Sequence, residues 1–308
     1  MRVPFEFRSF EEVTVKGYVW KGEQAPIGVM ILAHGMAETI LRYDAFATYL
    51  AAQGIVVYGY SHRGHFETAG SLERLGYLGK EGWSKMAEDL NTVVNRAKAE
   101  VPNVPVCIFG HSMGSYVTRT YLVSHPSDVD KVILSGTGYP QKLELQAAAF
   151  VARCERTIKR ADLPSKLLDK LSFGSFNKAF APTKTPFDWL STDPVEVQKY
   201  IDNPWCGQIH PASFFEDMAK NLARVLYGPM PKPKSTVPML LMSGALDPVG
   251  QMGKGVEQSA AFYKEAGYEV TLKLYPKGRH EMLNERNREE VYQDILKWII
   301  GGVFRGSI

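Results

Sequence analysis

The stretch "CIFGHSMGS", residues Cys107 to Ser115, places one serine between two glycines directly after an apolar run. Residues 104–109, "VPVCIF", predict a short buried strand, and residues from Met113 to His125 predict a helix. A serine on such a junction has its hydroxyl held out at the end of the sheet, because the flanking glycines remove side chains that would collide in the bend. The stretch therefore favours an α/β fold with a polar group at its edge.

Ser112 has two interpretations on this stretch alone. It is either a nucleophile or the N-cap of the following helix, in which case its hydroxyl would accept a backbone N–H. A single G-x-S-x-G pentapeptide does not decide between them, so the decision depends on the rest of the chain.

Length and composition indicate an ordinary globular protein. The chain has 308 residues, of which 45% are hydrophobic and 22% charged, enough for one large α/β domain or a domain with an insertion. The net charge is +3, from 36 Lys and Arg against 33 Asp and Glu, and no run of like charge resembles a nucleic-acid tail. We therefore expect no nucleic-acid partner.

The sequence also predicts where the protein resides. Residues 1–20 alternate apolar and polar residues and lack the continuous apolar core of a secretory signal, so we expect no export. No run approaches the ~20 apolar residues that cross a bilayer, which predicts a soluble protein. Cys107, Cys154 and Cys206 form no C-x-x-C pair and cannot all pair internally, which fits a reducing compartment. We expect a cytoplasmic location.

Strand-like and helix-like runs alternate along most of the chain. Two opening strands are expected near Phe5–Phe10 and Thr14–Trp20. The later strand-like runs are "GVMILAHG", "IVVYGY", "VPVCIF", "KVILSG", "PMLLMSG" and "EVTLKLY", with helices near Tyr43–Gln53, Trp83–Glu100 and Glu289–Ile300. This order predicts about eight strands, mostly parallel, with helices on both faces. In such sheets the chemistry collects at the carboxyl ends of the strands.

The alternation stops between Tyr139 and Lys234. We predict a core formed by residues 1–138 and 235–308, and a helical cap inserted over residues 139–234. Its alternative is an ordinary surface subdomain, but its aromatic residues favour an apolar wall that faces a ligand. The expected substrate-binding residues of this cap are Phe173, Phe176, Phe180, Phe187 and Trp189.

A serine nucleophile needs a base and an orienting carboxylate, in the chain order Ser, acid, His on this kind of sheet. Of the three histidines after Ser112, only His280 lies on a loop that follows a core strand, and its alternative is an exposed loop histidine. Asp247 follows the preceding strand in "LLMSGALDP", although an Asp-Pro pair is also a common turn. We therefore expect Ser112, Asp247 and His280 to be catalytic.

The oxyanion formed by the attack needs backbone donors. One is expected from Met113, directly after the nucleophile, and the other from Met36 in "ILAHGMAE", after an earlier strand. The alternative for this second stretch is a plain turn. Four independently placed elements agree, which favours the nucleophile interpretation of Ser112.

In these candidate residues and their order, the chain resembles the α/β-hydrolase superfamily, and within it the monoacylglycerol lipase and lysophospholipase-like serine hydrolases. The resemblance runs nearly end to end and rests on "HGMAE", "HRGH", "GHSMG", "SGALDP" and "GRHEMLNE", in the family's order. It implies a catalytic triad of Ser112, Asp247 and His280, with backbone donors at Met36 and Met113.

The chain departs from its relatives in two loops. Ser61 and Phe66 stand where relatives commonly have Asp and a second Gly, and Ala37 stands where they often have Gly. Glu38 and Arg42 are interpreted either as a pair that holds the oxyanion loop or as a solvated charge pair.

His62 and His65 have a spacing seen in metal sites, but without Cys or carboxylate ligands nearby we expect no metal. The expected chemistry also needs no organic cofactor.

These observations predict a serine ester hydrolase that acts through an acyl-enzyme, with a single-chain lipid ester such as a monoacylglycerol or lysophospholipid as substrate. Lys232 and Lys234 would suit a lysophospholipid if they lay at the cap mouth, although such lysines usually face solvent. The alternatives are a peptidase or another α/β-hydrolase chemistry, and a hydrolase-like protein that binds a small molecule without turnover. An exposed apolar cap is a candidate for contact with a membrane surface or with a second copy in a homodimer.

Overall fold

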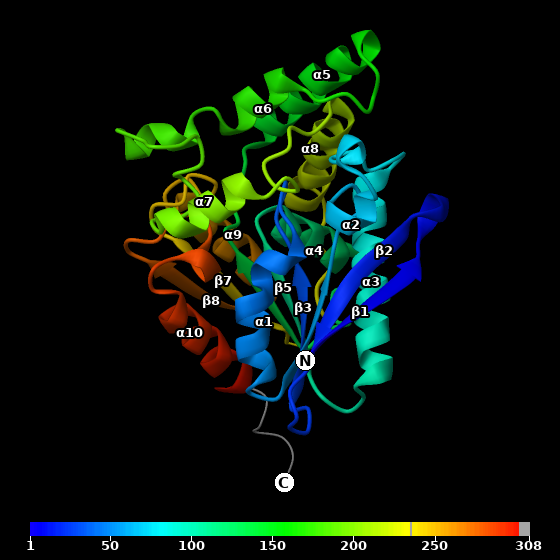
Figure 1. Ribbon diagram of the computed structural model, residues 1–308, viewed down its shortest axis with the longest axis vertical. Coiled ribbons are helices and arrows are strands. Elements are labelled where there is room, and N and C mark those ends of the chain that lie inside the picture. Colours follow the sequence, from blue (N-terminus) through cyan, green and yellow to red (C-terminus); the bar gives the residue numbers. More distant parts are fainter. Residues whose placement is uncertain (235, 302–308) are drawn as a thin grey trace.

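One sheet of eight strands runs through the molecule in the order β1-β2-β4-β3-β5-β6-β7-β8 (Figure 1). The computed structural model describes residues 1–234 and 236–301. The β1–β2 and β2–β4 pairings are antiparallel, and the other five are parallel. The strands are β1 (Arg2–Arg8), β2 (Thr14–Trp20), β3 (Gly28–Ala33), β4 (Ile55–Tyr60), β5 (Val106–His111), β6 (Lys131–Ser135), β7 (Pro238–Gly244) and β8 (Glu269–Tyr275). The predicted mostly parallel sheet is confirmed.

Helices cover both faces of this sheet. The α-helices are α1 (Asp44–Ala51), α2 (Phe66–Ala69), α3 (Gly82–Glu100), α4 (Met113–Ser124), α5 (Lys142–Ile158), α6 (Lys166–Phe173), α7 (Pro194–Asp202), α8 (Ala212–Tyr227), α9 (Lys254–Glu265) and α10 (Arg288–Gly301). Short 3-10 helices are η1 (Phe10–Glu12), η2 (Ile40–Tyr43), η3 (Leu72–Arg74), η4 (Phe176–Phe180) and η5 (Met282–Asn284).

The central strand β3 separates two hydrophobic cores, because successive residues of a strand point to opposite faces. Val29 and Ile31 pack into a cluster with residues of α3, α4, α8 and α9. Met30 and Leu32 pack into the other cluster, with residues of α1 and α10. All six residues of β3 are buried, as expected for a strand covered on both faces.

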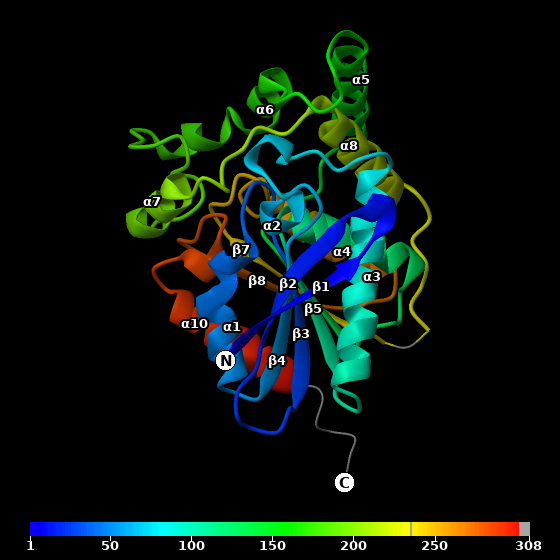
Figure 2. The same cartoon turned by 45° about the vertical axis from the view of Figure 1, so that its right-hand side comes forward.

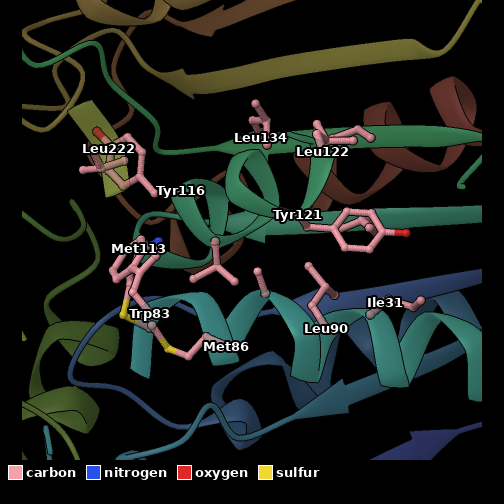
Figure 3. Packing of buried hydrophobic residues seen from close by; sticks show 14 of the residues in the cluster. Ile31, Trp83, Met86, Leu90, Met113, Tyr116, Tyr121, Leu122, Leu134 and Leu222 are labelled. Atoms are coloured by element: carbon pink, nitrogen blue, oxygen red, sulfur yellow. The ribbon is translucent and has the colours of Figure 1, made fainter. Parts of the chain in front are cut away.

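Figure 3 shows the first cluster where α3 meets α4, with Trp83 and Met86 of α3 facing Met113 and Tyr116 of α4. The side chain of Met113 is buried there, with 2% of the residue exposed. This packing anchors the start of α4, the residue directly after Ser112.

The segment between β6 and β7 contains α5, α6, η4, α7 and α8, and its outer helices α5 and α6 stand above the sheet (Figures 1 and 2). Its last helix, α8, places Phe214 and Leu222 in the hydrophobic cluster of the sheet. The division into a core and a cap of residues 139–234 stays a prediction, and residue 235, where the core was expected to resume, lies outside the described residues.

Two strands differ in their bounds from the expectation. β1 ends at Arg8 and not at Phe10, because Glu11 and Glu12 have φ of 57° and 58° and reverse the chain before β2. β5 extends to His111, because its pairing with β6 continues to His111 opposite Ser135.

Candidate active site

Ser112 lies on a sharp turn between β5 and α4, with φ 50° and ψ −117°. This is a strained conformation for a residue with a side chain. A Cβ on Gly114 would lie 2.0 Å from the carbonyl oxygen of Ala33, and one on Gly110 would lie 2.5 Å from Oγ1 of Thr118. The turn therefore requires both glycines that flank the serine.

The Ser112 side chain makes no capping hydrogen bond at the start of α4. The Ser115 hydroxyl donates instead to the backbone oxygen of Ser112, over 2.6 Å. Ser112 lines a cavity, so its hydroxyl is available to a ligand and the N-cap interpretation has no hydrogen bond to support it.

Asp247 and His280 meet on the loops that follow β7 and β8. Nδ1 of His280 lies 3.0 Å from each carboxylate oxygen of Asp247. The Asp247 carboxylate also accepts hydrogen bonds from the Ser243 hydroxyl, at 2.8 Å, and from the Val249 N–H, at 2.9 Å. Both members of the pair are buried, so the carboxylate holds one orientation of the imidazole.

Each member of this pair shifts the pKa of the other. Burial alone would raise the pKa of Asp247, but the charge of His280 and the hydrogen bonds outweigh it, and the pKa is lowered. Burial lowers the pKa of His280, but the Asp247 carboxylate outweighs burial, and the pKa is raised. An ionised carboxylate thus faces a histidine whose protonated form it stabilises.

A cavity of about 310 Å³ brings together segments far apart in the chain. Ser112 and His280 line it, and so does Met36 on the loop after β3. Met113 contributes the first residue of α4, whose leading N–H groups have no partner within the helix. The structure therefore places the residues expected for the nucleophile, the base and one oxyanion donor, Met36, around one cavity, while Met113 adjoins it in the chain directly after Ser112.

Three of the five expected cap residues, Phe173, Phe187 and Trp189, line this cavity. Trp189 also packs against His280, with ring centroids 5.0 Å apart. The other two, Phe176 and Phe180, are not among the lining residues. The Phe176 ring packs against Trp189, with centroids 5.1 Å apart, and the Phe180 ring packs against the guanidinium of Arg279.

Sequence reasoning missed other lining residues of the inserted segment, among them Asp169, Leu190, Tyr200 and Ile209. Leu190 and Tyr200 are buried hydrophobic residues whose pattern could have marked them as inward-facing. Burial raises the pKa of Asp169, and no local signal distinguishes this acid from the surface acids around it.

Glu38 and Arg42 form a buried pair and not a solvated one, with 2.8 Å between Arg42 Nη1 and Glu38 Oε2. Glu38 accepts a hydrogen bond from the N–H of Gly35, two residues before Ala37, whose φ is 55°. The pair therefore shapes the loop that carries Met36.

His62 and His65 belong to a buried cluster with His34 and His210. Nε2 of His65 lies 3.2 Å from Nε2 of His210, and the His34 and His62 rings are 4.5 Å apart. Phe66, at one of the two departures from the family pattern, packs against Trp205 of the inserted segment. The "HRGH" loop therefore contacts the inserted segment.

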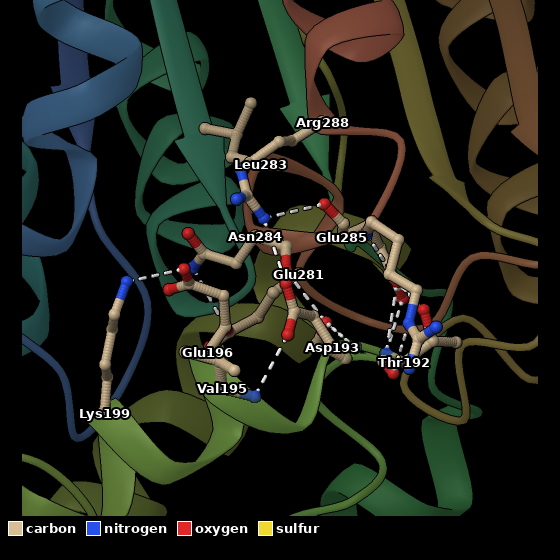
Figure 4. Close-up of polar contacts among 12 residues, drawn as sticks. Thr192, Asp193, Val195, Glu196, Lys199, Glu281, Leu283, Asn284, Glu285 and Arg288 are labelled. Atoms are coloured by element: carbon tan, nitrogen blue, oxygen red, sulfur yellow. Dashed lines mark hydrogen bonds and ion pairs between the residues drawn. The ribbon is translucent and has the colours of Figure 1, made fainter.

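Polar contacts also join the inserted segment to the loop that carries His280 (Figure 4). The buried Glu285 carboxylate accepts a hydrogen bond from the N–H of Thr192, whose nitrogen lies 3.1 Å from each carboxylate oxygen. It also accepts one from the N–H of Arg279, at 2.8 Å. Arg288 reaches Asp193 at 3.1 Å. The wall of the cavity and the loop that carries His280 are therefore held together.

Comparisons with known proteins agree with this geometry. Residues 24–287 match the family model described as serine aminopeptidase, S33. A monoacylglycerol lipase of Mycolicibacterium smegmatis is 29% identical over 290 residues, which cover 92% of this chain and 91% of the relative. A monoglyceride lipase of Rattus norvegicus is 26% identical over 284 residues, 91% and 84% of the two chains. A solved carboxyl esterase from Bacillus coagulans, in complex with glycerol, is 27% identical with a TM-score of 0.89 and coverage of 97% and 98%.

Proposed function

The chain belongs to the family of the serine aminopeptidase S33 model, within the α/β-hydrolase superfamily, and is a serine hydrolase; from this premise we propose that it cleaves carboxylic esters through an acyl-enzyme at Ser112. The observation that carries the proposal is the placement of Ser112 and His280 on one cavity, with the Asp247 carboxylate 3.0 Å behind the imidazole. A protein that only binds a ligand has no need of this aligned base.

In the proposed mechanism, His280 takes the proton of Ser112 as the serine oxygen attacks the ester carbonyl. Asp247 stabilises the imidazolium, and the N–H groups of Met36 and Met113 receive the oxyanion. The C–O bond to the alcohol then breaks, and His280 returns the proton to the leaving alcohol. Water, deprotonated by His280, then attacks the acyl-enzyme carbonyl. The bond from the acyl carbon to Ser112 Oγ breaks, His280 returns the proton to that oxygen, and the acid and the free serine are released.

The lining of the cavity favours an uncharged lipid ester as substrate. Its wall of Phe173, Phe187 and Trp189 suits an acyl chain. The described lining contains the carboxylates of Glu38, Asp169 and Glu281 and the imidazoles of His111 and His280, but no lysine or arginine. Because carboxylates repel a phosphate, we propose a monoacylglycerol-like ester and not a lysophospholipid.

Lys232 and Lys234 give no support to a lysophospholipid. The N–H of Lys234 donates to the hydroxyl of Ser127, three residues after α4 ends at Ser124, and so near the end of that helix remote from Ser112. These lysines therefore lie away from the cavity that Ser112 lines.

The first test is hydrolysis of p-nitrophenyl esters from acetate to palmitate, with fluorophosphonate labelling of the protein in parallel. The proposal expects a chain-length optimum and labelling in the wild type, and loss of both in Ser112→Ala. Ser124→Ala, an exposed serine on the same helix, is the matched control and should keep both.

The main alternative, a peptidase, is tested with the matching p-nitroanilides. Turnover of anilides but not esters would favour the peptidase. Absence of both activities together with an unlabelled Ser112 would favour the binding protein.

The outer face of α5 and α6 is proposed to touch a lipid surface. Leu143, Phe150 and Ile158 of α5 are 76%, 68% and 85% exposed, and Leu171 of α6 is 64% exposed. Exposed Lys166 and Lys170 accompany them on α6, which suits an anionic surface.

Flotation with phosphatidylglycerol vesicles tests this face, and Leu171→Glu should abolish co-flotation. A dimer seen by sedimentation that the same variant disrupts would assign the face to the expected homodimer instead. None of the helices in residues 1–234 and 236–301 is long and apolar enough to span a membrane, and the cytoplasmic location stays a prediction.

A further inference from the structure

One guanidinium joins the loop that carries Met36 to the loop that carries His280. Nη1 and Nη2 of Arg42 each lie 2.6 Å from one carboxylate oxygen of Glu281, and Nη1 also lies 2.8 Å from Glu38. Such a bidentate arginine–carboxylate pair fixes the relative orientation of the two side chains as well as their distance. Glu281 directly follows His280, so Arg42 ties together two loops that are 239 residues apart in the chain.

The Glu38 end of this arrangement sets the shape of the oxyanion loop. Its carboxylate accepts hydrogen bonds from the N–H of Gly35 and, at 2.8 Å, from the hydroxyl of Tyr43. A Cβ on Gly35 would lie 2.6 Å from that carboxylate, so the loop closes tightly around it. The residue between Gly35 and Ala37 is Met36, the proposed second oxyanion donor.

The inserted segment contacts the same group. The ring of Tyr200 in α7 lies 4.9 Å from the guanidinium carbon of Arg42, and the N–H of Gly207 donates to the carbonyl oxygen of Ala37 over 2.8 Å. The N–H of Glu281 donates to the carbonyl oxygen of Leu190, also over 2.8 Å. The loop that carries Met36, the loop that carries His280 and the inserted segment therefore meet around Arg42.

We infer that Arg42, held between Glu38 and Glu281, is a positioning residue that sets the separation of the oxyanion donor at Met36 from the base His280. This inference rests on the proposed function, because it assigns a role within the same reaction. The guanidinium does not line the cavity, so it acts through the two loops and not on the substrate.

Three variants separate position from charge. Arg42→Lys keeps the positive charge but loses the bidentate pairing with Glu281. The formal charge of Glu38, Arg42 and Glu281 together is −1, and the double variant Arg42→Met with Glu281→Gln has the same sum without the pairing. Glu281→Gln alone keeps Arg42 and nearly all side-chain volume.

Arg42→Lys and the double variant are expected to lower kcat about 10- to 100-fold on p-nitrophenyl butyrate, with KM within about threefold, since misplacement of reacting groups by about 1 Å costs that much. The acid limb of the pH–rate profile should stay in place in both, because the charge sum is kept. Glu281→Gln should move that limb to lower pH, because it removes a negative charge beside His280.

Arg63→Lys is the matched control. Arg63 is another buried guanidinium, 3.0 Å from Asp89, and is not among the cavity lining. It should lower the melting temperature as much as Arg42→Lys does while kcat stays within twofold of the wild type.

The inference is overturned if Arg42→Lys or the double variant keeps the wild-type kcat, if only KM rises, or if Arg63→Lys loses kcat equally. Should Arg42→Lys fail to fold, Glu281→Gln decides, and an unchanged kcat at the plateau of its pH profile overturns the inference. An inactive wild type, unlabelled at Ser112, would refute the proposed function itself, whereas an active wild type with unimpaired variants refutes only the role of Arg42.

Discussion

Single residues determine how closely the loop that carries Asp247 packs against the loop that carries His280. A Cβ on Gly244 would lie 2.0 Å from the carbonyl oxygen of Gly278, so Gly244→Ala must push the loop of Asp247 away from that of His280. We expect kcat to fall about 100-fold, as for a misplaced catalytic group. Gly70→Ala is the control, because Gly70 has φ 80° but nothing within 4 Å of its added Cβ. It should cost about 1 kcal/mol of stability and leave kcat unchanged.

Asp169 is the residue expected to select against anionic substrates. Its carboxylate lines the cavity and has no ion-pair partner within the described residues. Asp169→Asn should raise kcat/KM for a lysophosphatidate relative to a monoacylglycerol about 10-fold, which corresponds to ~1.4 kcal/mol of relieved repulsion. Asp162→Asn, a more exposed acid just before α6, should leave the ratio unchanged. An unchanged ratio in Asp169→Asn would show that the carboxylate does not meet the head group.

Between elements, the Glu285 carboxylate holds the loop after β8 to the segment before α7. Glu285→Ala leaves the partly buried N–H groups of Thr192 and Arg279 without their acceptor, and a loss of this kind costs about 1–3 kcal/mol when the group is buried. We expect chemical denaturation to show a loss of about 2–4 kcal/mol, together with a lower kcat because His280 lies on the same loop. Glu289→Ala, at an exposed position of α10, should change stability by less than about 0.5 kcal/mol. Equal losses in the two variants would contradict this role.

The elements differ in how far their sequence predicts them. β3 and β5 are predictable because a buried strand is a short continuous apolar run, and the order of strand ends then indicates which loops meet. The pairing of Arg42 with Glu281 has no local signal, because it joins residues 239 positions apart. Phe180 was expected at the cavity but lies on Arg279, since residues 174–193 contain little regular structure and no periodicity indicates which side chains face inward.

For the molecule as a whole, buried histidines predict a loss of stability in mild acid. Burial is the main cause that lowers the pKa of five of them: His34 and His111 to about 4, His65 to about 3, and His62 and His210 well below the ordinary value. The unfolded chain binds these protons near pH 6.5 while the folded chain does not, so stability falls as pH drops from about 6.5 towards 4. Each histidine contributes at most ~1.4 kcal/mol per pH unit in this window. The raised pKa of His280 acts in the opposite direction.

Urea denaturation at pH 7.5, 6.5 and 5.5 measures this dependence. The urea midpoint should fall steadily with pH. His210→Gln should make this fall shallower, because unfolding of the variant takes up as much as one proton fewer. A midpoint that stays level from pH 7.5 to 5.5 would rule out a neutral, buried cluster.

The strand order has a consequence for how the protein is made. Residues 2–135 supply six adjacent strands, and β7 and β8 join one edge of that sheet only after the segment between β6 and β7 has been synthesised. Because a chain emerging from the ribosome folds from its N-terminus, Ser112 takes its place while β6 is still an open edge that can pair with other chains. The proposed base, His280, is synthesised last, on the loop after β8. A growing chain is therefore at risk of aggregation through the open edge of its sheet until its final strand has been translated. Until then it also lacks hydrolytic activity.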